Sequence, residues 1–423
     1  MTQNMQTSPK SNPVPLDRAK QLAATLLSER GEASGAVVAR ELNQVLRSLD
    51  VSDRHGFQRY LAAAFQPDKA ALRAVAERYL ADSNAEAAAA LAKAADPPRQ
   101  ELLRRMNMAP GGTGALIAMR SELAIYLRDE PELKLLDFDL KHLFSSWFNR
   151  GFLELRRIDW RSPAAVLEKL IAYEAVHEIK GWDDLRRRVA PDRRCFAFFH
   201  PALPDEPLIF VEVALVQGLA TSMPPLLSQD GDEDAARAQA ENADTAIFYS
   251  ISNCQEGLRG VSFGNFLIKQ VVEELKAEFP QLKQFSTLSP IPGLRRWLGQ
   301  RLANGSDADV ALLPELERDG WWNDPQQSET LRANLMQLCA TYLTLKPSIR
   351  IDPVARFHLG NGARLERINW LGNTAPRGIQ ESFGIMVNYL YDHDSIEANH
   401  EAFVHDGTIA RSADVDALLT KPD

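Results

Sequence analysis

Cysteine is scarce in this sequence, with only Cys195, Cys254 and Cys339 among 423 residues and no CxxC or CxxH spacing. A small, odd number of cysteines argues against a disulfide framework, and the missing ligand spacings argue against a zinc site. Thiols that are not organised for pairing are typical of a reducing compartment. We therefore expect a cytoplasmic protein that holds no metal ion.

Long apolar runs and an excess of basic residues are also absent. No stretch of about 18 apolar residues occurs, so no segment is expected to span a membrane. Residues 1–14 are polar and contain prolines, which predicts a disordered tail rather than a signal peptide. Lysine and arginine number 48 against 57 aspartate and glutamate, a formal net charge of -9. Nucleic acids and anionic membranes require a basic face, so we expect neither as a partner.

The first part of the chain has the periodicity of amphipathic helices. A chain of 423 residues exceeds the size of a single core, so two or three domains are expected. Breaks are predicted at Gly31, Pro67, Ser83 and the pair Pro97 and Pro98. We predict a helical domain over residues 15–148. Apolar residues recur at intervals of three and four in segments 16–30, 32–50, 55–65, 68–81, 84–95 and 110–131.

The second part, residues 149–423, mixes helices with short runs rich in aromatic and β-branched residues. The runs have the length and composition of strands, and the acidic segment 228–244 is expected to form a solvated loop or a short exposed helix. The predicted class is therefore α+β, with a mixed or antiparallel sheet in the second domain. The expected helices cover 162–179, 261–279 and 329–346, and the expected strands lie in 193–201, 207–215, 244–252, 283–290, 363–372 and 382–392.

A glycine-rich loop with Gly257, Gly260 and Gly264 separates the expected strand 244–252 from the helix that follows. A helix start after such a loop offers unpaired backbone N–H groups to an anion such as phosphate. Alternatively, the glycines only let a strand turn tightly into a helix. The loop matches neither Walker A nor GxGxxG. Its GVSFG segment matches GxSxG, but Ser262 follows the strand too late for a nucleophile elbow.

Two other positions allow both a structural and a catalytic interpretation. In FSTLSPIPGLRRWL, Ser289 is followed by two prolines, which fits either a rigid turn after a strand or a serine held for chemistry. His358 lies between two apolar residues, as a buried structural histidine or a catalyst would. Asp352, six residues earlier, is close enough in sequence to orient His358. The residues alone leave these alternatives open.

Several long segments resemble the malonyl-CoA decarboxylase family in the same order along the chain: RRCFAFFHP, FVEVAL, YSISNCQEGLRGVSFGNFLIKQVVEEL, LSPIPG and DPVARFHLGNGARLERINW. The resemblance extends from about Leu102 to about Tyr391. It implies a carboxy-lyase of fatty acid metabolism that converts malonyl-CoA to acetyl-CoA and CO2. It also implies an all-helical N-terminal domain that forms a homo-oligomer, a dimer or tetramer, and a GNAT-like catalytic domain with a mixed, mainly antiparallel sheet.

The resemblance also implies specific residues. Ser289 of LSPIPG corresponds to the family's proton acceptor, His358 of FHLGNGA to its proton donor, and Tyr391 to a further active-site tyrosine. No cofactor is expected, since the thioester itself accepts the electron pair released on decarboxylation. The residues implied to bind coenzyme A are Arg259, Gly260, Val261, Ser262, Phe263, Gly264 and Asn265.

Three other functions remain open at this level. A GNAT-type acyltransferase would use the same coenzyme A site together with an acceptor amine. A catalytically silent coenzyme A sensor would require damaged catalytic motifs, whereas LSPIPG and FHLGNGA are whole. A hydrolase would use Ser262 as its nucleophile.

Overall fold

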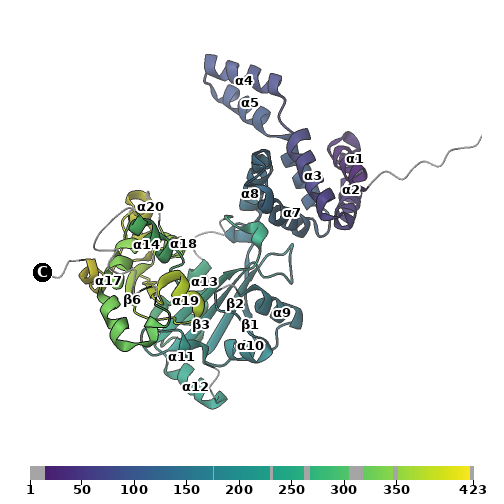
Figure 1. Ribbon diagram of the computed structural model, residues 1–423. Helices are drawn as coiled ribbons and strands as arrows, with labels where there is room; N and C mark the ends of the chain where they lie inside the picture. Colours follow the sequence, from purple (N-terminus) through teal and green to yellow (C-terminus); the bar gives the residue numbers. More distant parts are fainter. Residues whose placement is uncertain are drawn as a thin grey trace, which may run out of the picture. The chain divides into compact units, whose positions relative to one another are not determined.

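The computed structural model describes residues 15–174, 176–228, 232–261, 267–303, 316, 318–345 and 351–419, and the chain divides into two compact units (Figure 1). The predicted disordered tail, 1–14, lies outside the described residues. The domain boundary between residues 148 and 149 stays a prediction. The first unit takes its described residues from Met1–Glu154, His200–Glu206 and Gln255–Phe263, and the second from Leu155–Phe199, Pro207–Cys254 and Gly264–Asp423.

The first unit is built mainly from helices, drawn in purple and blue in Figure 1. Asp50, Asp68 and Asn84 each accept a hydrogen bond from the backbone N–H three residues later and so cap the starts of three helices. The helices are α1 (Pro15–Leu27), α2 (Glu29–Ser48), α3 (Val51–Ala64), α4 (Lys69–Ala81), α5 (Ala85–Ala95), α6 (Pro98–Asn107), α7 (Gly112–Tyr126) and α8 (Lys134–Trp147).

The breaks between these helices agree with the sequence except at the first one. Pro67, Ser83 and Pro97 lie between helices as predicted, and Pro98 occupies the first position of α6. The predicted break at Gly31 is wrong, because α1 ends at Leu27 and α2 begins at Glu29. The Ser28 hydroxyl donates to the carbonyl of Thr25 and ends the first helix earlier.

An ion pair is buried among the helices of the first unit. Nε of Arg99 lies 2.7 Å from a carboxylate oxygen of Asp139, and the same guanidinium donates to the carbonyl of Ala62 at 3.1 Å. Gln100 donates to the other oxygen of Asp139 at 2.9 Å. The buried charges are therefore paired and hydrogen-bonded, as burial requires.

The second unit contains a seven-stranded sheet in the order β1-β2-β3-β4-β5-β7-β6. Pairs β2–β3, β3–β4, β5–β7 and β6–β7 are antiparallel, whereas β4 and β5 are parallel. The predicted α+β class with a mixed, mainly antiparallel sheet is confirmed, and the GNAT-like fold stays a prediction. The strands are β1 (Glu154–Ile158), β2 (Arg193–Phe199), β3 (Ile209–Val216), β4 (Thr245–Asn253), β5 (Gln284–Thr287), β6 (Arg364–Asn369) and β7 (Met386–Leu390).

The helices of the second unit include the crossover that the parallel pair requires, α13, between β4 and β5. The acidic segment contains the short helix α12, and the helix expected over 162–179 ends at Tyr173. No helix of the described residues is long and apolar enough to cross a membrane. The main helices are α9 (Ala164–Tyr173), α10 (Trp182–Arg188), α12 (Glu233–Asn242), α13 (Leu267–Glu278), α14 (Leu294–Ala303), α17 (Pro325–Leu343), α18 (Pro353–Gly360), α19 (Pro376–Ser382), α20 (Ile396–Asp406) and α21 (Ala413–Leu419).

The two central strands, β4 and β5, pair only over the first part of β4. The parallel pairing of β4 and β5 runs from Thr245 to Phe248 on β4, and the next contact is the hydrogen bond from N of Leu288 to O of Phe248, at 3.0 Å. Beyond it, β4 continues to Asn253 alongside β3. The chain that leaves β5 at this point carries Ser289.

Candidate active site

Ser289 is fixed by the backbone on both sides. Its N–H donates to the carbonyl of Val387 on β7 at 2.8 Å, and its carbonyl accepts from the N–H of Val387 at 3.0 Å. The side chain is buried. Its hydroxyl lies 2.8 Å from Oγ1 of Thr287, to which it donates, and 3.1 Å from Nε2 of His358. The serine after the strand is thus both part of a rigid turn and in contact with the predicted histidine.

His358 lies on α18, a helix whose start is defined by Asp352. The Asp352 side chain accepts hydrogen bonds from the N–H groups of Val354 and Ala355, and Pro353 occupies the first helical position. The imidazole is buried and stacks on the ring of Tyr389, with 4.7 Å between ring centroids. Burial lowers the pKa of His358 to about 3. The ring is therefore neutral at neutral pH.

Tyr391 completes a line of three hydrogen-bonded side chains. Its hydroxyl lies 2.7 Å from Nδ1 of His358, on the opposite side of the ring from Ser289. Burial raises the pKa of the Tyr391 hydroxyl, so this group is protonated at neutral pH. Because the Ser289 hydroxyl donates to Thr287, the neutral imidazole donates from Nε2 to Ser289 and accepts at Nδ1 from Tyr391. Such a line can hold a proton at either ring nitrogen and pass it on.

Asp352 does not orient His358 through a direct contact, contrary to the hypothesis drawn from the sequence. Its carboxylate accepts from the N–H of Gly293 at 2.9 Å and from the hydroxyl of Tyr342 at 3.3 Å, besides capping α18. Burial raises its pKa, although these donors act in the opposite direction. Asp352 therefore joins the LSPIPG segment to the helix that carries His358.

Gly293 is required by this junction for steric reasons. A Cβ at this position would lie 2.0 Å from the hydroxyl of Tyr342 and 2.9 Å from a carboxylate oxygen of Asp352. No side chain fits at such distances. The glycine of LSPIPG thus permits the close approach of the serine segment to Asp352.

The predicted coenzyme A loop is described in part. Arg259, Gly260 and Val261 follow a short 3-10 helix, Glu256–Leu258, in the first unit. Gly260 has φ of 75°, a left-handed conformation that favours glycine, and the Arg259 side chain is exposed. The predicted binding residues Ser262, Phe263, Gly264 and Asn265 lie outside the described residues. Ser262 is also the serine of the GxSxG match.

Among the described residues, no group of three or more His, Cys, Asp or Glu side chains is arranged to hold a metal ion.

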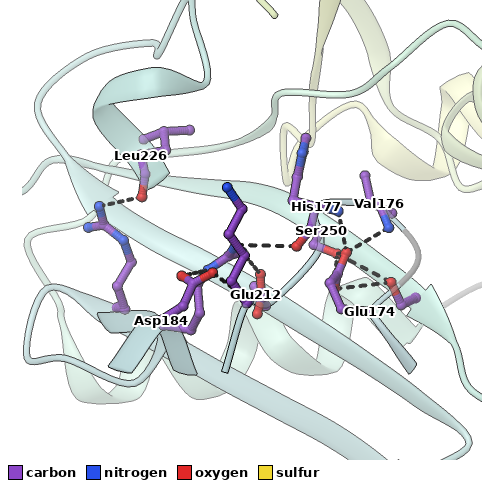
Figure 2. A network of polar contacts seen from close by, with 11 residues as sticks. Glu174, Val176, His177, Asp184, Glu212, Leu226 and Ser250 are labelled. Carbon is purple, nitrogen blue, oxygen red and sulfur yellow. Dashed lines mark hydrogen bonds and ion pairs between the residues drawn. The ribbon is translucent and has the colours of Figure 1, made fainter. Parts of the chain in front are cut away.

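The sequence interpretation missed a buried polar network next to β3 and β4, which Figure 2 shows. Glu212 receives a hydrogen bond from Arg188 at 2.7 Å, and Glu174 accepts from the hydroxyl of Ser250. Burial raises the pKa of Glu212 to about 8, against the opposing effect of Arg188. The signal was a single glutamate inside the apolar run FVEVAL, because a charge buried in a strand requires a partner.

His177 belongs to the same network. From the lowered pKa values of His177 and His358 we predict that the free energy of unfolding falls as the pH falls. Burial lowers the pKa of His177 to about 4 and that of His358 to about 3. Below about pH 6.5 the unfolded chain therefore binds more protons than the folded one. Each histidine should reduce the free energy of unfolding by up to about 1.4 kcal/mol per pH unit as the pH falls from about 6.5 to 5.

Urea denaturation of the parent and of His177→Gln at pH 7.0, 6.0 and 5.0 measures this effect. The variant should lose less free energy of unfolding than the parent over the same range, and His393→Gln, which changes an exposed side chain, should behave as the parent does. Equal slopes for the parent and His177→Gln would contradict the prediction.

Comparison with known proteins gives one consistent family. The malonyl-CoA decarboxylase C-terminal domain matches residues 151–423, and the N-terminal domain of the same family matches residues 65–148. The chain is 38% identical over 354 residues to "Malonyl-CoA decarboxylase, mitochondrial" of Anser anser anser, covering 77% of this chain and 70% of that protein. The corresponding protein of Mus musculus is 36% identical over 361 residues, with 77% and 72% covered.

Solved structures agree with this. The crystal structure of malonyl-CoA decarboxylase from Rhodopseudomonas palustris is 49% identical with a TM-score of 0.89, covering 96% of this chain and 100% of that one. The one from Cupriavidus metallidurans is 36% identical with a TM-score of 0.73, covering 96% and 98%.

Proposed function

The chain belongs to the malonyl-CoA decarboxylase family, and on that premise we propose that Ser289, His358 and Tyr391 carry the reaction in which malonyl-CoA loses CO2 and becomes acetyl-CoA. The enzyme is a carboxy-lyase. One observation carries the proposal: Nε2 of His358 lies 3.1 Å from the serine hydroxyl while Nδ1 lies 2.7 Å from the tyrosine hydroxyl. This line of groups is suited to managing the one proton that the reaction consumes.

The first step breaks the bond between the carboxylate carbon and C2 of the malonyl group. The electron pair of that bond moves into the thioester carbonyl and forms an enolate, so the step needs no organic cofactor. The enolate oxygen needs fixed hydrogen-bond donors, and removal of one such donor typically costs about 10²- to 10³-fold in rate. We assign this role to backbone N–H groups where β4 and β5 separate, beyond Phe248.

The second step delivers a proton to C2 of the enolate, and we assign it to His358. Its ring is neutral at neutral pH because burial lowers the pKa to about 3. A malonyl carboxylate bound near Ser289 would add a negative charge beside the ring, and such a charge raises the pKa of an imidazole. Substrate binding would thus load His358 with the proton that the enolate later takes.

The other two side chains have supporting roles in this proposal. Ser289 hydrogen-bonds the departing carboxylate, which leaves as CO2 and gives up no proton. The role of proton acceptor that the family implies for Ser289 stays a prediction. Tyr391 holds Nδ1 of His358 and keeps the ring in one orientation. The neutral imidazole of His358 and the protonated hydroxyl of Tyr391 suit general acid–base catalysis, which is worth about 10²- to 10⁴-fold in rate.

Coenzyme A is proposed to bind through its phosphates at Arg259 to Asn265. The exposed Arg259 side chain and the exposed, left-handed Gly260 support this assignment, since an arginine and a backbone N–H group suit phosphate oxygens.

The decisive test mixes the purified protein with malonyl-CoA alone and follows acetyl-CoA by mass spectrometry. We expect acetyl-CoA to form without any acceptor. An acyltransferase would need an added amine, and a coenzyme A sensor would bind malonyl-CoA but leave it unchanged. Full activity of Ser262→Ala would exclude the hydrolase. Unchanged malonyl-CoA with the parent protein would contradict the proposed function.

Three further expectations stay predictions. They are self-association through residues 15–148 as a dimer or tetramer, catalysis confined to residues 149–423, and a cytoplasmic location. The curated relatives named above include mitochondrial proteins.

A further inference from the structure

Arg120, on α7, holds the chain that leads into the coenzyme A loop. Its guanidinium donates to the carbonyl of Gly257 at 2.6 Å and to the carbonyl of Arg259 at 2.9 Å, while Nε donates to a carboxylate oxygen of Asp137 at 2.8 Å. The side chain is buried. All these residues belong to the first unit. One arginine thus binds two carbonyls of the loop and is itself fixed by a carboxylate.

The loop also lies directly against the backbone of α7. A Cβ on Gly257 would come within 2.0 Å of the carbonyl oxygen of Ile117, so only glycine fits there. The Arg120 contacts and this close approach fix the same segment of the loop, Gly257 to Arg259. Its conformation is therefore set by a helix of the first unit rather than by the loop sequence alone.

The hydrogen bond to Arg259 has a consequence for the next residue. In a trans peptide the carbonyl and the following N–H point in opposite directions. Because the Arg259 carbonyl faces the buried Arg120, the N–H of Gly260 points away from it, at an exposed position. The N–H groups of Arg259 and Val261 donate to the carbonyls of Glu256 and Leu258 at 3.0 Å each, so Gly260, with φ of 75°, supplies the exposed N–H of this turn.

The positively charged side chain of Lys141 lies beside Gly260. Cε of Lys141, on α8, would lie 3.8 Å from a Cβ on Gly260, and its ammonium group lies 3.0 Å from Asp137. The Lys141 side chain is 45% exposed, so its charge is accessible. Arg120 and Lys141 together carry two positive charges against one on Asp137. The excess charge next to Gly260 favours an anion.

From these contacts we propose that Arg120 is a positioning residue for the phosphate-binding loop and that Lys141 contacts the phosphates of coenzyme A. The proposal rests on the proposed binding of coenzyme A by this loop, and it concerns the loop's described residues, Gly257 to Val261. It assigns a part of substrate recognition to α7 and α8, which lie in the helical part of the chain.

The test compares two substrates that differ in their phosphates. Arg120→Lys keeps a charge for Asp137 but cannot bridge two carbonyls. We expect it to raise KM for malonyl-CoA by about 10- to 100-fold. KM for the malonyl thioester of N-acetylcysteamine, which has no phosphate, should change less than about twofold. A purely structural defect would affect both substrates equally and would overturn the proposal.

Arg99→Lys is the matched control. Arg99 is equally buried and likewise binds an aspartate and a backbone carbonyl, but its partners are Asp139 and Ala62 rather than the loop. It should change KM for the two substrates by the same factor. The proposal would be overturned if Arg99→Lys raised KM for malonyl-CoA, relative to KM for the short thioester, as much as Arg120→Lys does.

Lys141→Ala keeps the proposal testable if Arg120→Lys does not fold. It removes a half-exposed side chain and should raise KM for malonyl-CoA several-fold without affecting the short thioester. Calorimetric titration with coenzyme A separates this proposal from the catalytic one. Weakened coenzyme A binding in the variants supports the loop assignment even if the parent forms no acetyl-CoA, and parent-like binding in an active Arg120→Lys enzyme overturns it.

Discussion

His358→Gln is expected to lower kcat for malonyl-CoA by about 10²- to 10⁴-fold while changing KM only a few-fold. Glutamine retains hydrogen-bonding groups but cannot carry a proton at neutral pH. Initial rates of acetyl-CoA formation over a range of malonyl-CoA concentrations separate kcat from KM. Because His358 is buried, the folded state of the variant should be checked by its urea midpoint.

A graded series makes this result specific. Ser289→Ala should lower kcat by a similar factor, and Tyr391→Phe by less, because Tyr391 supports Nδ1 without contacting the reacting atoms in our proposal. His200→Gln is the control. His200 donates to the carbonyl of Trp147 and accepts from the N–H of Ala202, in the other unit. If His358→Gln retained more than about a tenth of the parent kcat, His358 would not be the proton donor.

Gly293→Ala is expected to lower the free energy of unfolding by about 3 kcal/mol and kcat by 10-fold or more. The added methyl group would lie 2.0 Å from the Tyr342 hydroxyl, so the serine segment or α17 must move. Movement of the segment would lengthen the distance between Ser289 and His358. Urea denaturation gives the first quantity and steady-state rates the second.

Two further variants test the cause of the effect. Gly299→Ala, on α14, adds a methyl group with no atom within 4 Å and should be neutral or stabilise by up to about 1 kcal/mol. Tyr342→Phe removes the hydroxyl that clashes, so in combination with Gly293→Ala it should restore part of the lost stability. If the double variant were as unstable as the sum of both single ones, the clash would not be the cause.

Much of the fold follows from local patterns in the sequence. The helices of the first unit have clear apolar periodicity and capping residues. β2, β3 and β4 are mostly apolar and buried along nearly their whole length, as in strands that are covered on both faces. The helix that carries His358 was missed, although Asp352 followed by Pro353 is a typical helix start. It was missed because α18 is short and directly precedes the strand-like segment 363–372.

The geometry of the site could not be predicted in this way. Ser289 and His358 are 69 residues apart in sequence, and their contact depends on the pairing of Ser289 with Val387 and on the binding of Gly293 by Asp352. Such contacts arise from non-local packing, which the sequence of either segment does not contain. The role of Asp352 was misread for the same reason, since its partner Gly293 is distant along the chain.

The place of β7 in the sheet has a consequence for synthesis of the protein. β7 is the last strand that the structure describes along the chain, yet it lies between β5 and β6, pairs with Ser289 and leads directly into Tyr391. During translation, the earlier strands emerge first, while the serine has no partner to hold it. The nascent chain therefore completes the proposed phosphate-binding loop well before it completes the proposed machinery for breaking a carbon–carbon bond.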